Sequence, residues 1–215
     1  MTDNTQHIVT ISKTDLAVLP VAAFHGNIIV VDSPEQVDDA IAVLRAADII
    51  GFDTETRPSF KKGQTYSVSL LQLSTHDTCF LFRINKIGVP ESLKALLEDE
   101  DKLKIGLSLH DDFHNMHKLC EFTPAGFVDL QPFVKDYMIA DNSLARIYGI
   151  LFSQRISKGQ RLTNWEAKNL TKCQQAYAAL DAQACIEIYQ YLMSGQFDPW
   201  TSPYLQEIEP QPIEE

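Results

Sequence analysis

Short apolar runs alternate with amphipathic segments along the first two thirds of the chain. The amphipathic segments have helical spacing, with Val37, Ile41 and Leu44 on one face of the first and three leucines on one side of the second, at 91–99. Before the first, Ser33, Pro34 and Gln36 indicate a helix start with a capping box. The apolar runs are short and rich in β-branched or aromatic residues, so we expect strands at 27–31, 48–55, 66–74, 78–83, 102–109 and 126–130.

A helix is expected from about 111 to 121, before the last of these strands. From Gln131 onward the pattern is helical, and it ends in a long helix from about Thr171 to Met193. Strands joined by hairpins come first, and alternating helices and strands follow. This order predicts an α/β fold, a mixed sheet flanked by helices.

The two ends of the chain differ from the region between them. We expect residues 1–25 to be an N-terminal extension forming an extended arm, and residues 26–194 to be one domain. Residues 195–215 contain four prolines and should form an irregular tail, although Trp200, Tyr204 and Leu205 can dock on the domain.

Apolar runs, the N-terminal residues and the cysteines indicate the cellular compartment that we expect for this protein. No run of about 18 apolar residues is present, so no membrane span is expected. The N-terminus lacks the basic and apolar regions of a secretory signal. The four cysteines form no CxxC pair, so we expect reduced thiols in a cytoplasmic protein.

The net charge of −11 argues against a general nucleic-acid binder, which usually has a basic face. Part of this charge is local, because five acids fall within residues 196–215. The acidic tail is therefore a candidate surface for a protein partner. Four more acids are candidate metal ligands, and two divalent cations would cancel their charge.

Asp53 and Glu55 lie at the end of an apolar strand. Residues i and i+2 of a strand point to the same face, so both carboxylates share the face opposite Phe52 and Thr54. Two buried carboxylates repel each other, and a hard cation such as Mg²⁺ or Mn²⁺ would relieve the repulsion. The alternative is that the strand ends by Asp53 and both acids are solvated.

Tyr177 and Asp181 are four residues apart in the final helix, so they are neighbours on one face beside an apolar stripe. An acid there needs a partner, which can be a cation site or simply a nearby Lys or Arg. A third acidic pair, Asp111 and Asp112, lies where a strand runs into a helix. Acids at that position can cap the helix and favour its dipole, and one of them can still be a metal ligand.

Taken together, these segments resemble the DEDD superfamily of 3′–5′ exonucleases, in the branch with a tyrosine in its last motif (DEDDy). The resemblance runs from about residue 28 to 194 and is closest to the Werner-syndrome and ribonuclease D groups. The three motifs are 51–56, 104–112 and 177–182, with supporting matches at 71–73, 163–166 and 170–171. The resemblance implies a ribonuclease H-like fold.

The same resemblance implies hydrolysis of phosphodiester bonds at nucleic-acid 3′ ends by two-metal-ion catalysis, which releases nucleoside monophosphates. It implies that two divalent cations, Mg²⁺ or Mn²⁺, are held by Asp53, Glu55, Asp112 and Asp181, and that Tyr177 orients the attacking water. The family spacing favours Asp112, with Asp111 as the alternative ligand.

Basic residues flank the first and last motifs. Arg57, Lys61 and Lys62 surround Phe60 directly after the first motif, and we expect them to bind substrate through phosphate contacts and base stacking. The alternative is an exposed hairpin loop with solvated charges. A second basic group, Lys158, Arg161 and Lys168, precedes the final helix.

Two other interpretations compete with an exonuclease. His110, His114 and His117 have helical spacing, which a zinc site would accept. The chain can also be a non-catalytic module that keeps the exonuclease fold and binds nucleic acid or protein.

Overall fold

A mixed six-stranded sheet forms the centre of the computed structural model, which describes residues 6–208. The strand order is β2-β5-β4-β3-β6-β7, and β4 alone runs antiparallel to its two neighbours. The strands are β2 (Asn27–Val31), β3 (Ile49–Thr56), β4 (Val68–Ser74), β5 (Thr78–Phe82), β6 (Leu103–Gly106) and β7 (Phe127–Asp129). The predicted mixed sheet is confirmed, and all six predicted strands are present.

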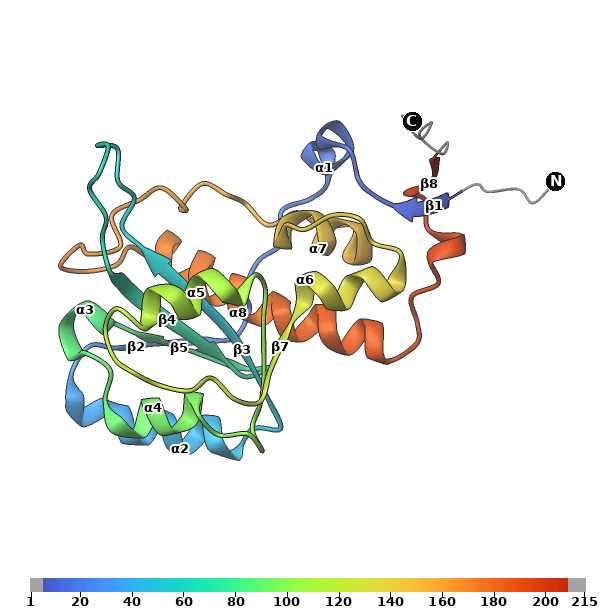
Figure 1. Ribbon diagram of the computed structural model, residues 1–215. Helices are drawn as coiled ribbons and strands as arrows, with labels where there is room; N and C mark the ends of the chain where they lie inside the picture. Colours follow the sequence, from blue (N-terminus) through green and yellow to red (C-terminus); the bar gives the residue numbers. More distant parts are fainter. Residues whose placement is uncertain (1–5, 209–215) are drawn as a thin grey trace, which may run out of the picture.

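Helices cover both faces of this sheet (Figure 1). On one face, α2 (Val37–Ala46), α4 (Glu91–Leu97) and α5 (Leu109–Met116) pack against a core that includes Phe52, Leu71 and Phe82. The long helix α8 (Lys172–Met193) crosses the other face, where Leu70 and Leu81 meet Ala178 and Ala179. Short helical turns complete the layers, namely η1 (Pro34–Gln36), α3 (Ile84–Ile87), α6 (Leu130–Phe133) and η2 (Val134–Tyr137).

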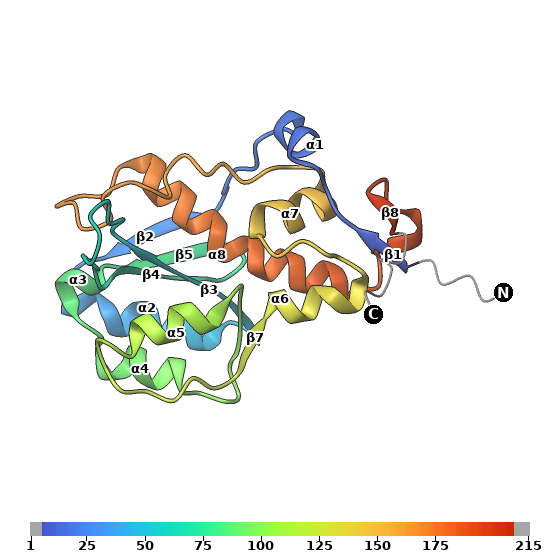
Figure 2. The same ribbon diagram turned by 45° about the horizontal axis from the view of Figure 1, so that its top comes forward.

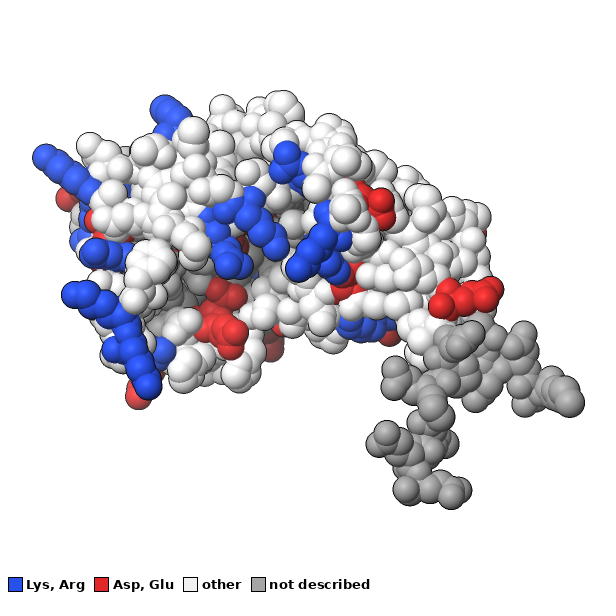
Figure 3. Space-filling model, turned by 90° about the horizontal axis from the view of Figure 1, so that it is seen from above, with Lys and Arg blue, Asp and Glu red and all other residues white. Residues whose placement is uncertain are grey.

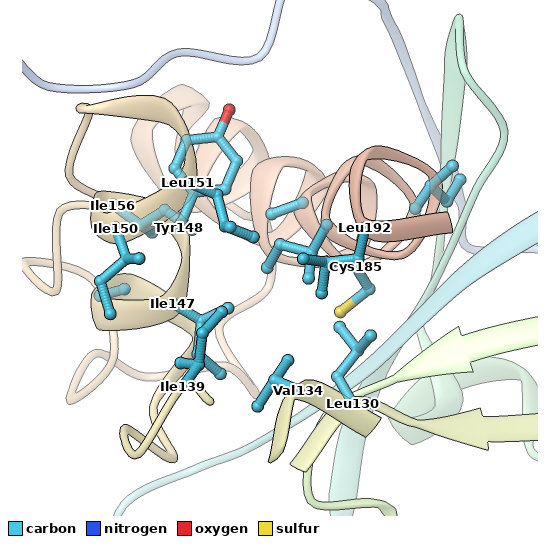
Figure 4. Close-up of a cluster of buried hydrophobic side chains, with 14 of the residues drawn as sticks. Leu130, Val134, Ile139, Ile147, Tyr148, Ile150, Leu151, Ile156, Cys185 and Leu192 are labelled. Carbon is cyan, nitrogen blue, oxygen red and sulfur yellow. The ribbon is translucent and has the colours of Figure 1, made fainter. Parts of the chain in front are cut away.

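A second apolar core lies beside the sheet, between α8 and α7 (Leu144–Phe152) (Figure 4). Val134, Ile139 and Ile147 are fully buried there and face Cys185 and Leu192 of α8. This core fixes the C-terminal half of α8 and leaves its N-terminal half over the sheet (Figure 2).

Gly51 sets the distance between α8 and the sheet. A Cβ at this position would lie 1.9 Å from the backbone oxygen of Ala182. Gly51, Asp53 and Glu55 share one face of β3, so the helix that passes over Gly51 reaches the two acids. Only glycine permits this approach of backbone to backbone.

Both ends of the described chain contain regular structure that the sequence analysis missed. The expected extended arm contains β1 (Gln6–Val9) and the helix α1 (Lys13–Val18), whose N-cap Ser12 accepts from the Asp15 N–H at 3.0 Å. The expected irregular tail contains η3 (Pro199–Thr201) and β8 (Leu205–Ile208). β1 and β8 pair antiparallel, so pairing with a distant strand overrides the weak local pattern of each.

Docking of the tail follows the prediction only in part. Tyr204 and Leu205 pack against the second core, whereas Trp200 is 61% exposed and lies against His7. Three of the five tail acids, Glu209, Glu214 and Glu215, lie outside the described residues.

The domain boundaries expected at residues 26 and 194 stay a prediction. Among residues 6–208, no helix is long and apolar enough to span a bilayer.

Both boundaries of the helix expected at about 111–121 are wrong. The helix expected from about 111 begins at Leu109 and ends at Met116. Ser108, with φ 62°, turns the chain out of β6, and the Asp129 carboxylate accepts from the N–H groups of Ser108 and Leu109 at 2.9 and 3.0 Å. A side chain from β7 thus caps this helix, and no local sequence signal shows it.

Candidate active site

The first two acids lie on β3 beneath α8. Phe52 points to the other face of the sheet and is buried in the core beneath α2, α4 and α5. Side chains thus alternate between the two faces, and the strand continues through both Asp53 and Glu55. Glu55 is 8% exposed. The alternative of two solvated acids beyond the strand is therefore wrong.

Asp181 approaches this pair from α8. Its side chain is 6% exposed, and carboxylate oxygens of Asp53, Glu55 and Asp181 lie within 4.8 Å of one another. α8 begins with a capping box, in which the Thr171 hydroxyl accepts from the Gln174 N–H at 3.2 Å. Two elements far apart in sequence thus bring three carboxylates to one point.

The cluster is electrostatically unfavourable without a cation. Burial, followed by the charges of Asp181 and Asp112, raises the pKa of Glu55 from its ordinary 4.5 to about 9. Burial raises the pKa of Asp181 to about 7, although hydrogen bonding by Tyr177 and the charge of Lys158 lower it. Burial and the same neighbouring acids also raise the pKa of Asp53 well above its usual range.

Tyr177 lies one turn before Asp181 and packs against Trp165, with ring centroids 6.1 Å apart. Asp181 is the carboxylate whose charge acts most strongly on the Tyr177 hydroxyl. Burial and the nearby carboxylates raise the pKa of Tyr177 far above its ordinary 10. The hydroxyl therefore keeps its proton at neutral pH and serves as a hydrogen-bond donor.

Asp112 and Asp111 occupy different environments on α5. The Thr54 hydroxyl donates a hydrogen bond to the half-buried Asp112, and burial raises the pKa of Asp112 to about 6 despite this bond. The charge of Asp112 in turn acts on Asp53 and Glu55. The side chain of Asp111 is 83% exposed and lies 3.3 Å from His110. Asp112 is thus the acid of this pair that faces the cluster, although it lies outside the group of three.

The three carboxylates and Tyr177 line a cleft of about 370 Å³, here called the catalytic cleft. Lys158 and Arg161 of the second basic group also line it, and Lys168 does not. The cleft wall also contains residues that sequence reasoning missed, among them Leu107, Asn142, Ser143 and Leu144. They belong to the loop after β6 and to the start of α7, and only tertiary contacts bring them to the acids.

Seen from above, basic side chains gather around a hollow whose floor is acidic (Figure 3). The positive charges at the rim partly offset the acidic floor, since Lys158 lowers the pKa of Asp181 and Arg161 lowers that of Glu55. A rim of this kind suits an anionic substrate whose reacting group must lie close to carboxylates.

The predicted substrate loop lies to one side of the catalytic cleft. Arg57 pairs with Glu166 at 3.1 Å and stacks over the Tyr66 ring at 4.7 Å. Arg57 and Lys61 line a separate hollow of about 390 Å³ with Phe60, which is 81% exposed. Lys62 is exposed. None of the three basic residues lines the catalytic cleft.

The histidines do not form a metal site. Among residues 6–208, Asp53, Glu55 and Asp181 are the one group of potential ligands close enough to share an ion. The ring of His110 is 93% exposed, and His117 Nε2 lies 2.9 Å from the Phe122 carbonyl oxygen.

The arrangement of the sheet and its flanking helices is that of the ribonuclease H-like exonuclease domains. The Aedes aegypti Nibbler exonuclease domain superposes with a TM-score of 0.72 at 23% identity, covering 83% of this chain and 96% of that one. The sequence profile of the family described as 3′–5′ exonuclease matches residues 28–195. The chain therefore belongs to the 3′–5′ exonuclease family of the DEDD superfamily.

Curated relatives share part of their length with the chain. It is 30% identical over 184 residues to the bifunctional 3′–5′ exonuclease/ATP-dependent helicase WRN of Mus musculus, covering 81% of this chain and 13% of that protein. It is 29% identical over 189 residues to a 3′–5′ exonuclease of Arabidopsis thaliana, covering 80% of this chain and 66% of that protein.

Proposed function

We propose that this protein is an active, metal-dependent 3′–5′ exonuclease of the DEDDy type, which releases nucleoside monophosphates from nucleic-acid 3′ ends by two-metal-ion catalysis. The observation that carries the proposal is the group of three acids from β3 and α8, whose carboxylate oxygens lie within 4.8 Å of one another in the catalytic cleft. Such a cluster is costly to fold and is relieved by bound cations.

The residues present fit a hard divalent cation. Exonucleases of this family use divalent cations, and all three donors are carboxylates, the ligands that Mg²⁺ and Mn²⁺ favour. Asp53, Glu55 and Asp181 would hold one cation, and Asp53 with Asp112 would support the second. When bound, the cations neutralise the acids, activate a water for attack and stabilise the departing 3′ oxygen.

Side chains of the protein position the substrate. The Tyr177 hydroxyl stays protonated and can orient the attacking water by hydrogen bonding. Lys158 and Arg161 can contact phosphate oxygens at the rim, because both line the catalytic cleft beside the acids. On the adjoining loop, Phe60 can stack on a base while Arg57, Lys61 and Lys62 approach phosphates.

The decisive experiment follows a 3′-labelled oligonucleotide, as DNA and as RNA, with Mg²⁺, with Mn²⁺ and with a chelator. We expect mononucleotide release with either cation and none with the chelator. Asp53→Ala or Asp181→Ala should reduce turnover below detection. Tyr177→Phe should reduce kcat by roughly 10- to 100-fold, because the ring still packs and only the hydrogen-bond donor is lost.

Thermal unfolding of the metal-free variants provides the control. Each Asp→Ala change removes a repelling charge, so these variants should unfold at the same temperature as the wild type or higher, and loss of turnover then reflects chemistry. Full Mg²⁺-dependent activity of Asp53→Ala would refute the site assignment.

A further inference from the structure

A basic groove, here called the arm groove, continues the catalytic cleft toward the N-terminal arm. It has a volume of about 350 Å³ and shares Ala145, Ile156 and Lys158 with the catalytic cleft. Four cationic residues line it, and the apolar part of its wall includes Leu16 and Ala17 of α1. The cations are Lys13, Arg146, Arg155 and Lys158, and no acid is among the described residues that line it.

Backbone hydrogen bonds hold the arm in place as a wall of this groove. The Val9 N–H donates to the Met138 oxygen at 2.8 Å, and the Ala22 N–H donates to the Arg155 oxygen at 3.0 Å. Arg155 Nε donates to the Leu19 oxygen at 3.1 Å. The arm is thus attached on both sides of α1.

The Leu16 side chain of α1 lies against α7. A Cβ at Gly149 of α7 would lie 2.7 Å from the Leu16 Cδ1, so Leu16 contacts the helix at this glycine. Both ribbon views show α1 beside α7 (Figures 1 and 2).

The charge of the arm groove is exceptional for this chain. The net charge is −11, yet the arm groove gathers four of the 18 Lys and Arg residues. Arg146 is paired with Asp141 at 2.6 Å, but within residues 6–208 neither Lys13 nor Lys158 forms an ion pair by its Nζ. Two exposed ammonium groups are therefore available to an anion along one path into the catalytic cleft.

We propose that the arm groove binds a single strand of nucleic acid next to the nucleotide being cleaved. Lys13 and Lys158 contact successive phosphates, and a base lies on the apolar wall of Leu16, Ala17 and Ile156. The inference rests on the proposed function. It also extends the substrate site beyond residues 28–195 that match the family, because Lys13 lies in the preceding arm.

Binding of a fluorescent single-stranded 12-mer, as DNA and as RNA, tests the arm groove without cleavage. Anisotropy in the presence of a chelator is measured over a series of salt concentrations for the wild type, Lys13→Ala and Lys94→Ala. Lys94 is the matched control because α4 lies on the face of the sheet opposite α8. We expect Lys13→Ala to weaken binding and to reduce the slope of log K against log salt by about 0.7, the value for one lost phosphate contact on a single strand.

The outcomes separate this inference from the proposed function. The arm groove proposal is overturned if the slopes of log K against log salt are equal for Lys13→Ala and Lys94→Ala. It is also overturned if the wild type shows no measurable binding. A reduced slope for Lys13→Ala supports it, even if the wild type releases no mononucleotide with Mg²⁺ or Mn²⁺. Absence of mononucleotide release with both cations would refute the proposed function and leave the arm groove proposal standing.

Discussion

At the scale of single residues, the acids of the cluster control how stability depends on pH. The raised pKa values mean that the folded metal-free protein retains protons that the unfolded chain releases. Stability is therefore highest below the ordinary pKa of each group. The contribution of each acid to stability decreases as the pH rises from its ordinary pKa to its pKa in the folded protein, which is about 7 for Asp181 and about 9 for Glu55.

We expect the melting temperature of the metal-free protein to fall from about pH 5 to about pH 8, by several degrees if roughly 1–2 kcal/mol is lost. Mn²⁺ or Mg²⁺ should restore it, and more so at the higher pH, because the cation binds the ionised acids. Thermal unfolding with a chelator and with each cation measures both effects. Asp181→Asn should flatten the pH dependence and abolish the rise with metal; an unchanged pH profile in this variant would contradict the assignment.

Strand and helix periodicity paired four of the site residues that lie on regular elements, whereas the family spacing was needed to choose Asp112. Alternation along 49–56 placed Asp53 and Glu55 on one face, and helical spacing paired Tyr177 with Asp181. Asn142 and Ser143 had no such signal, because their approach to the acids depends on how the segment before α7 packs. The basic residues after the first motif marked Arg57 as a candidate for binding substrate. Its pairing with Glu166 could not be predicted, because the two residues lie in loops far apart in the sequence.

At the scale of elements, the contact between β3 and α8 assembles the site. Gly51→Ala would place a methyl group 1.9 Å from the Ala182 oxygen, and neither backbone can yield without moving the helix. We expect a loss of about 3 kcal/mol in the free energy of unfolding. The kcat should also fall, because α8 carries Asp181 and Tyr177.

Urea unfolding and the oligonucleotide assay measure these two effects. Gly159→Ala is the matched control, since its Cβ would meet only Ser157 Oγ at 3.5 Å. If the two variants have the same stability and activity, the close approach at Gly51 is not what holds α8 in place.

Elements with strong local patterns were predictable, and elements made by distant pairing were not. The run 27–31 matches β2 residue for residue, and the helix expected from Thr171 has that residue as its cap. β8 is mostly exposed and has no apolar alternation, so it becomes a strand only because β1 lies beside it. Its local sequence cannot specify that partner.

At the scale of the whole molecule, Asp141 joins the N-terminal arm to the exonuclease fold. Its carboxylate is 6% exposed and accepts from the Ile11 N–H at 3.0 Å, the Thr10 hydroxyl at 2.9 Å and Arg146 at 2.6 Å. Asp141→Ala would leave a buried N–H and a cation without their acceptor. We expect a loss of about 2 kcal/mol in the free energy of unfolding. This is less than the loss typical of breaking a fully buried ion pair, because Arg146 is partly exposed.

Urea unfolding of Asp141→Ala and Asp141→Asn measures this loss. The asparagine keeps one acceptor oxygen, so it should cost less than alanine. Hydrogen exchange at the Ile11 amide should accelerate in both variants. If exchange stays at the wild-type rate, the arm is held by its backbone pairing and not by Asp141.

The pairing of β1 with β8 has a kinetic consequence. Gln6 lies opposite Ile208, so this small sheet closes a loop that contains nearly the whole described chain. The entropy lost in closing so long a loop is recovered only after the intervening chain has collapsed. We therefore expect the two ends to join late in folding, after the sheet and α8 have brought the carboxylates together.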